Sequence, residues 1–100
     1  MIKERPTFHP GEILREEFLK PAGIDGRRLA EALRLPCERI CGILAGEQSM
    51  CVDTALRLAR FFGTSDRFWL EVQMEYELHR ARRDSHHLRQ DILPFDGVAA

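Results

Sequence analysis

The sequence predicts an all-α domain of five helices with a short C-terminal extension. Apolar residues recur at spacings of three and four in five separate stretches, which is the period of an amphipathic helix. Prolines and glycines lie at the borders of these stretches, where they start or end helices. No stretch predicts a strand of consequence, and 100 residues with 44% hydrophobic content are enough for one domain with one core.

The first helix is expected to begin at Pro10, because a proline suits the first helical position. Pro21 and Gly23 end it, and Ile24 fills part of the core from the loop that follows. The residues expected to face inward are Ile13, Leu14, Phe18 and Leu19.

Two short helices follow, joined by a tight corner at residues 34–36 (RLP). Asp25 is a suitable N-cap for the first of them. Pro36 disfavours helical torsions at Leu35 but suits the first turn of the second helix, which Gly46 ends. The expected inward residues are Leu29, Ala30 and Leu33 in the first helix and Ile40, Ile43 and Leu44 in the second.

A helix, a short turn and a second helix form the helix-turn-helix pattern, which presents its second helix to a DNA major groove. A simple helical hairpin has the same pattern, so these residues alone leave both interpretations open.

The last two helices are predicted from longer apolar patterns. The fourth ends at Gly63, and the fifth, capped by Ser65, begins at Asp66 and extends to Arg83. The expected core residues are Val52, Ala55, Leu56, Ala59 and Phe62 in the fourth helix and Phe68, Trp69, Val72 and Tyr76 in the fifth.

The chain is therefore divided into an N-terminal arm (residues 1–8), a helical domain (residues 9–83) and a C-terminal tail (residues 84–100). The tail contains a short apolar patch at residues 92–95 (ILPF). This patch either folds back on the domain or docks on a second chain, and the alternative is a frayed terminus.

Composition restricts the function. The net charge of -1 and the pI near 6.4 differ from the basic balance usual in DNA-binding domains. Affinity for DNA must then come from a local patch, from dimerisation or from a partner. No stretch is long and apolar enough to span a membrane, and residues 1–9 lack the apolar core of a signal peptide. With three cysteines outside any disulfide framework, the sequence indicates the cytoplasm.

The thiols and imidazoles do not predict a metal site. Cys37 and Cys41 lie four residues apart on one helical face, and Cys51 follows near a turn. Paired thiolates can take a metal or sense oxidation, but zinc needs more ligands, and small half-buried cysteines are the alternative. No metal is assigned to the histidines His79, His86 and His87. No nucleophile motif or glycine-rich phosphate loop occurs, so we expect no cofactor and no enzymatic activity.

Three segments carry a family resemblance: residues 9–21 (HPGEILREEFLKP), 53–60 (DTALRLAR) and 63–73 (GTSDRFWLEVQ). In this order around the predicted corner, they resemble HigA-type antitoxins, also called virulence-associated protein I. The resemblance covers roughly residues 7–83 and implies a dimeric repressor domain of the Cro/cI type, in the Xre family. Family members neutralise a small toxin, generally a ribosome-dependent mRNA endonuclease of the RelE-like fold (HigB), and repress their own operon.

The resemblance places DNA contacts on the second helix of the corner. Family members commonly carry arginine, asparagine, asparagine, lysine and arginine at the five positions where this chain has Glu38, Cys41, Ala45, Glu47 and Gln48. Arg39 is expected on the exposed face, where it can contact a guanine or a phosphate, and its alternative is a surface pair with Glu38 or Glu47. The candidate DNA-binding residues are Arg27, Arg28, Pro36, Cys37, Glu38, Arg39, Cys41 and Gly42.

The leading hypothesis is thus a HigA-like antitoxin that binds operator DNA as a homodimer, represses its own operon and neutralises a RelE-like toxin. One alternative is a protein-interaction module on a helix-turn-helix scaffold whose DNA binding is weakened or lost. Another is a solitary Xre-type transcriptional regulator. The fifth helix and residues 92–95 are candidate dimer surfaces.

Overall fold

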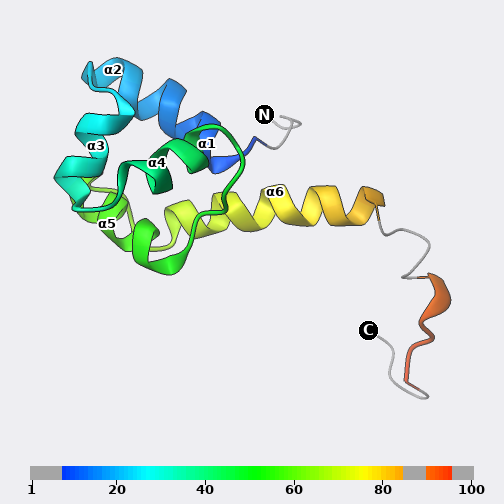
Figure 1. Cartoon of the computed structure of the whole chain (residues 1–100). Helices are drawn as coiled ribbons and strands as arrows, with labels where there is room; N and C mark the ends of the chain where they lie inside the picture. Colours follow the sequence, from blue (N-terminus) through cyan, green and yellow to red (C-terminus); the bar gives the residue numbers. More distant parts are fainter. Residues whose placement is uncertain (1–7, 85–89, 96–100) are drawn as a thin grey trace.

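The computed structural model describes residues 8–84 and 90–95, and these residues contain helices and no strand (Figure 1). The first helix is continuous over α1 (Pro10–Ile13), a π-helical stretch η1 (Leu14–Leu19) and α2 (Lys20–Ala22). It is followed by α3 (Gly26–Leu33), α4 (Cys37–Leu44), α5 (Val52–Phe62) and α6 (Phe68–Asp84). The prediction of an all-α fold with five helices is confirmed.

Side-chain caps start three of the helices. The Nδ1 atom of His9 accepts a hydrogen bond of 2.9 Å from the Gly11 N–H, so His9 is the N-cap of α1. The Asp25 carboxylate accepts one of 2.9 Å from the Arg28 N–H, as predicted. The Ser65 hydroxyl accepts one of 3.1 Å from the Phe68 N–H. The cap at Ser65 is confirmed, but α6 begins at Phe68, two residues later than predicted.

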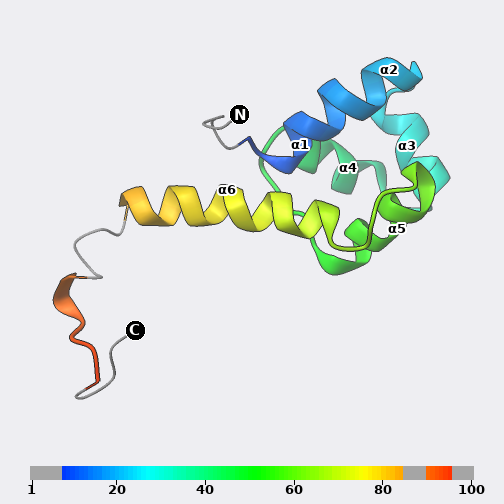
Figure 2. The ribbon, with the colours of Figure 1, turned by 180° about the vertical axis from the view of Figure 1, so that it is seen from behind.

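Helices α1 to α5 form a compact group, and α6 is a long rod whose first half packs against it (Figure 1). The second half of α6 projects beyond the other helices, as the opposite view also shows (Figure 2). The core lies where α1, α3, α4 and α5 meet the start of α6, and Trp69 is fully buried there. The other largest side chains with no exposed surface are Leu14, Leu29, Ile40, Ile43, Leu58 and Thr54.

Helix α5 buries a different face from the predicted one. Ala55 and Ala59 are buried as expected, but Val52 is 59% exposed and Leu56 is 46% exposed. Leu58 and Thr54 are fully buried instead. Apolar side chains occur around most of α5, so the sequence period alone does not select the buried face. The packing of α5 against α3 and α6 selects it.

Helix α6 buries one apolar and one polar side chain completely or nearly so. Trp69 is in the core as predicted, whereas the predicted core residues Phe68, Val72 and Tyr76 are half-buried. Gln73 is 7% exposed, and its Oε1 atom accepts a hydrogen bond of 2.6 Å from the Met50 N–H. This buried amide was not predicted from the sequence.

The apolar patch at residues 92–95 is exposed: Ile92 by 73%, Leu93 by 82% and Phe95 by 79%. In the single chain this segment therefore does not fold back on the domain. Residues 1–7 of the predicted arm and residues 85–89 and 96–100 of the predicted tail, which include His86 and His87, lie outside the described residues. Among the helices that the structure describes, none has the length and apolar character needed to cross a membrane.

Candidate nucleic-acid interface

The corner between α3 and α4 begins at Arg34, which adopts the left-handed conformation with a φ of 61°. The Leu35 N–H donates to the Ala30 carbonyl at 2.9 Å, and the Arg34 N–H donates to the Glu31 carbonyl at 3.1 Å. These two bonds form a Schellman motif, which ends α3 before the proline is reached. Pro36 lies at the N-cap of α4 and not within its first turn, so the predicted start of α4 was one residue too early.

One side of α4 is packed into the domain and the other faces outward. Ile40 and Ile43 are fully buried and Leu44 is half-buried, as predicted. The backbones of α1 and α4 lie so close at Gly11 that a β-carbon on this residue would overlap the Ile43 carbonyl. The exposed side chains of α4 are Glu38, Cys41 and, just after the helix, Ala45.

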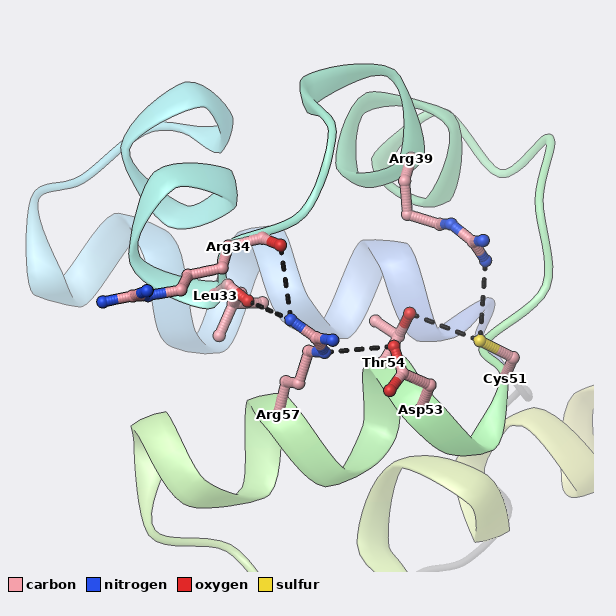
Figure 3. Close-up of polar contacts among 7 residues, drawn as sticks. All are labelled: Leu33, Arg34, Arg39, Cys51, Asp53, Thr54 and Arg57. Carbon is pink, nitrogen blue, oxygen red and sulfur yellow. Dashed lines mark hydrogen bonds and ion pairs between the residues drawn. The ribbon is translucent and has the colours of Figure 1, made fainter.

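Two arginines from other helices contact the ends of α3 and α4. Arg15 donates a hydrogen bond of 2.8 Å to the Leu44 carbonyl at the end of α4, where a helix dipole favours a cation. Arg57 on α5 donates one of 2.7 Å to the Leu33 carbonyl and lies 3.0 Å from the Asp53 carboxylate (Figure 3). The C-terminal end of α4 and the corner that precedes this helix are thus each held by a hydrogen bond from an arginine on another helix.

The predicted DNA-binding residues lie in the first turn of α3, directly before α4 and along α4. Arg27 and Arg28 are exposed in the first turn of α3, and Pro36 is exposed before α4. The Cys41 side chain, by hydrogen bonding, raises the pKa of the Cys37 thiol, whereas the charge of Arg27 lowers it, so Arg27 lies near the first turn of α4. Gly42 is buried, because the Gln48 side chain covers the space where a β-carbon would extend.

Arg39 is oriented differently from the prediction. It is half-buried, and its Nη1 atom donates a hydrogen bond of 3.5 Å to the Cys51 sulfur at the start of α5 (Figure 3). Hydrogen bonds with Thr54, together with the Arg39 charge, lower the pKa of Cys51. Within the described residues Arg39 has no ion pair with Glu38 or Glu47. The prediction that Arg39 is exposed on the outer face of α4 is therefore wrong.

The outer face of α4 therefore carries little positive charge of its own. Glu38 is exposed on it, and Glu47 is exposed in the turn that follows. The positive charges nearest to α4 in the sequence are the exposed Arg34 in the corner and the half-buried Arg39, and Arg27 and Arg28 lie further back, on α3. In the part of the chain that the structure describes, no group of three or more His, Cys, Asp or Glu side chains is suited to a metal ion.

Comparison with known proteins identifies the family, although no family model matches the chain. Virulence-associated protein I of Dichelobacter nodosus is 47% identical over 81 residues, which are 81% of this chain and 75% of that protein. Antitoxin HigA-1 of Vibrio cholerae is 34% identical over 80 residues, which are 80% of this chain and 74% of the antitoxin. The chain belongs to the HigA antitoxin family.

A solved HigA structure has the same fold. The Pseudomonas aeruginosa antitoxin HigA with the higBA promoter matches with a TM-score of 0.84 and 36% identity, over 90% of this chain and 99% of that one. The resemblance inferred from the three sequence segments is thereby confirmed, as is the Xre-type helix-turn-helix fold. In this fold α3 and α4 form the helix-turn-helix, and α4 is its second helix.

Proposed function

We propose that this chain is the antitoxin of a toxin–antitoxin pair, and that it binds operator DNA as a homodimer and represses its own operon. The observation that carries the proposal is the position of α4. Ile40 and Ile43 fix one side of this helix in the core, and its opposite side is exposed. The second helix of a helix-turn-helix enters the major groove with such a free face. The similarity to HigA with its promoter supports the same use here.

In this proposal residues 9–83 are the DNA-binding unit. Arg27 and Arg28 contact phosphates at the start of α3. The start of α4 approaches the bases and the sugar–phosphate backbone. The proposed contact residues on and before α4 are Pro36, Cys37, Glu38 and Cys41. Gly42 is buried beneath the Gln48 side chain, and Arg39 contacts DNA only if its guanidinium leaves Cys51. A homodimer is part of the proposal because one small helical domain makes too few base contacts for useful specificity.

The proposed protein partner is a toxin of the RelE-like mRNA endonuclease class (HigB), encoded beside the antitoxin. The names of the relatives support this partner. The chain itself is proposed to be non-catalytic and to act in the cytoplasm, where the operator DNA and the toxin's mRNA substrate are found.

A gel-shift titration against the DNA upstream of the gene tests the repressor function. We expect a shift whose affinity falls steeply with salt concentration, because phosphate contacts release counterions. Replacing Arg27 and Arg28 by Ala should weaken binding and make the logarithmic salt slope shallower by roughly 1 per lost phosphate contact. Arg60→Ala on α5 is the matched control. Absence of a shift at low salt, with and without the toxin, would contradict the proposal.

A second function is favoured by one observation, the acidic outer face of α4 with Glu38 and Glu47. In this alternative the chain binds its toxin but reads no operator. The double variant Glu38→Lys, Glu47→Lys separates the two functions. An operator-binding protein should gain DNA affinity steeply, while neutralisation of the toxin should hardly change in either case. A protein without DNA binding should fail to shift the upstream DNA before and after the substitution.

A further inference from the structure

Two thiols lie side by side at the start of α4. The Sγ atoms of Cys37 and Cys41 are 3.6 Å apart, because residues four apart on a helix are neighbours on its surface. Cys41 is exposed and Cys37 is half-buried, so a small molecule can reach the pair from solvent. The third thiol, Cys51, lies instead against Arg39 and Thr54 at the start of α5.

The spacing of the pair fits a shared ligand better than a disulfide. A disulfide needs an S–S distance of about 2.05 Å and β-carbons roughly 3.5–4.5 Å apart, whereas helical neighbours hold their β-carbons about 5–6 Å apart. Two thiolates bound about 2.3 Å from one atom lie roughly 3.8 Å from each other at a tetrahedral centre, as on zinc, and roughly 3.3 Å at a pyramidal centre with angles of about 90–95°. The observed separation of 3.6 Å lies between these two values. The helix therefore presents the two sulfurs at the distance at which one soft atom can bridge them.

The number of donors limits which atom that is. Structural zinc takes four protein ligands. In the described residues no third His, Cys, Asp or Glu side chain completes a group with these two thiols. A trivalent arsenic atom that carries one organic group needs only two further bonds, and thiol sulfur is the donor that such soft centres prefer.

We propose that Cys37 and Cys41 are a two-thiol binding site for monosubstituted trivalent arsenicals, and that an occupied site interferes with DNA binding by α4. With phenylarsine oxide, the As=O group condenses with two S–H groups to form two As–S bonds and one water molecule. Both thiol protons leave in that water. Arsenic stays trivalent, so the step needs no oxidant or reductant.

Occupation changes the surface that the proposed function places against DNA. The arsenic and its organic group would project from the first turn of α4, next to Glu38 and near Arg27. A group of that size prevents close approach of the backbone of α4 to the major groove. This second part rests on the proposed function, whereas the binding of the arsenical does not.

Binding is measured without DNA, by titrating the full chain with phenylarsine oxide and determining its intact mass. We expect one phenylarsine group per chain, and the same result for Cys51→Ser, which retains the pair as its only thiols. Cys37→Ser and Cys41→Ser should each lower the apparent affinity by at least about 100-fold, because the second As–S bond then no longer forms intramolecularly. Equal affinity of these variants and the wild type, or an arsenic bridge mapped to Cys51 by digestion of the labelled wild type, would overturn the site.

The effect on DNA is measured with the Cys51→Ser protein, with and without the arsenical. We expect loss of the operator shift on loading, recovery after addition of a competing small dithiol, and an unchanged helical circular dichroism spectrum. An unchanged shift by the loaded protein would overturn the interference while leaving the binding site standing. The unloaded wild type is the control, because Cys51 contacts Arg39. If neither unloaded protein gives a shift, the proposed repressor function fails, and the arsenical titration still decides the site.

Discussion

The Arg57 guanidinium on α5 donates a hydrogen bond of 2.7 Å to the Leu33 carbonyl, the last residue of α3 (Figure 3). The same Nη1 atom lies 3.3 Å from the Arg34 carbonyl. Carbonyls at the end of a helix have no partner inside it. One side chain from a helix distant in the sequence thus supplies donors to the end of α3 and fixes the corner that leads into α4.

Arg57→Ala should therefore lower the free energy of unfolding by about 1–2 kcal/mol, since hydrogen bonds to a charged donor are lost from half-buried carbonyls. The exposed i,i+4 pair with Asp53 contributes little to this value. Urea denaturation followed by circular dichroism measures the change. Arg60→Ala, one turn later on α5 and exposed, should stay within about 0.5 kcal/mol of the wild type. Equal losses in both variants would show that Arg57 does not hold the corner.

Arg34 is the only non-glycine residue with a positive φ in the described residues, so its replacement by glycine should stabilise the protein. An L-residue in the left-handed conformation costs roughly 1 kcal/mol, and glycine avoids this cost. The carbonyl that Arg57 approaches is retained, because it belongs to the backbone. We expect Arg34→Gly to raise the free energy of unfolding by about 1 kcal/mol in the same assay. Arg34→Ala removes the same guanidinium but keeps the strain, and a comparable gain there would refute the backbone explanation.

The parts of the fold that depend only on residues adjacent in the sequence could be predicted. The cap at Asp25, the helix start at Pro10 and the glycine stops at Gly23 and Gly63 are local, because each needs only residues within one turn. The prolines and glycines located the corner for the same reason, although Arg34 ended α3 where a glycine is the usual residue.

Long-range contacts account for what the sequence did not predict. Helix α5 has apolar residues on more than one side, so only its packing partners decide that Leu58 is buried and Leu56 exposed. Arg39 points inward because Cys51, twelve residues later in the sequence, offers its sulfur as a hydrogen-bond acceptor. The proximity of Arg27 to the Cys37 thiol depends likewise on how α3 packs on α4. A polar residue predicted on an outer face can thus turn toward a partner that no sequence period reveals.

Gln73 is the clearest case of such a partner, and it gives a further prediction. Its Oε1 atom accepts the buried N–H of Met50, and its Nε2 atom donates 2.8 Å to the Glu77 carboxylate. Gln73→Leu keeps the size of the side chain but leaves that N–H without its acceptor. We expect a loss of about 1–3 kcal/mol in the free energy of unfolding. Glu77→Ala leaves the bond to Met50 intact and should cost less than about 1 kcal/mol, whereas a loss as large as that of Gln73→Leu would assign the effect to Glu77.

His9 links the start of α1 to α6. Its Nδ1 atom accepts the Gly11 N–H at 2.9 Å, and its ring contacts the Tyr76 ring edge-on with centroids 5.0 Å apart. Burial lowers the pKa of His9 below its ordinary value of 6.5, and the charge of Arg80 acts in the same direction. A backbone contact with Gln48 raises the pKa, but burial outweighs it. The neutral imidazole is therefore the form that the folded chain prefers.

This preference makes the stability of the protein depend on pH. Below pH 6.5 the unfolded chain binds a proton at His9 more readily than the folded chain does, so the free energy of unfolding falls as the pH falls. The contribution of His9 to the free energy of unfolding is complete above pH 6.5 and is lost as the pH drops through the lowered pKa. Protonation also removes the Nδ1 acceptor that caps α1. Urea midpoints measured between about pH 5 and pH 8 should show this decrease.

His9→Asn separates the cap from the titration. Asparagine accepts the same N-cap hydrogen bond but does not titrate, so the variant should lose less stability than the wild type between pH 7 and pH 5. Both proteins keep His79, His86 and His87, and the difference between their pH profiles belongs to position 9. Because the ring contact with Tyr76 is lost, the variant should be less stable at pH 8. Parallel profiles for the two proteins would mean that His9 is not the group whose protonation weakens the fold.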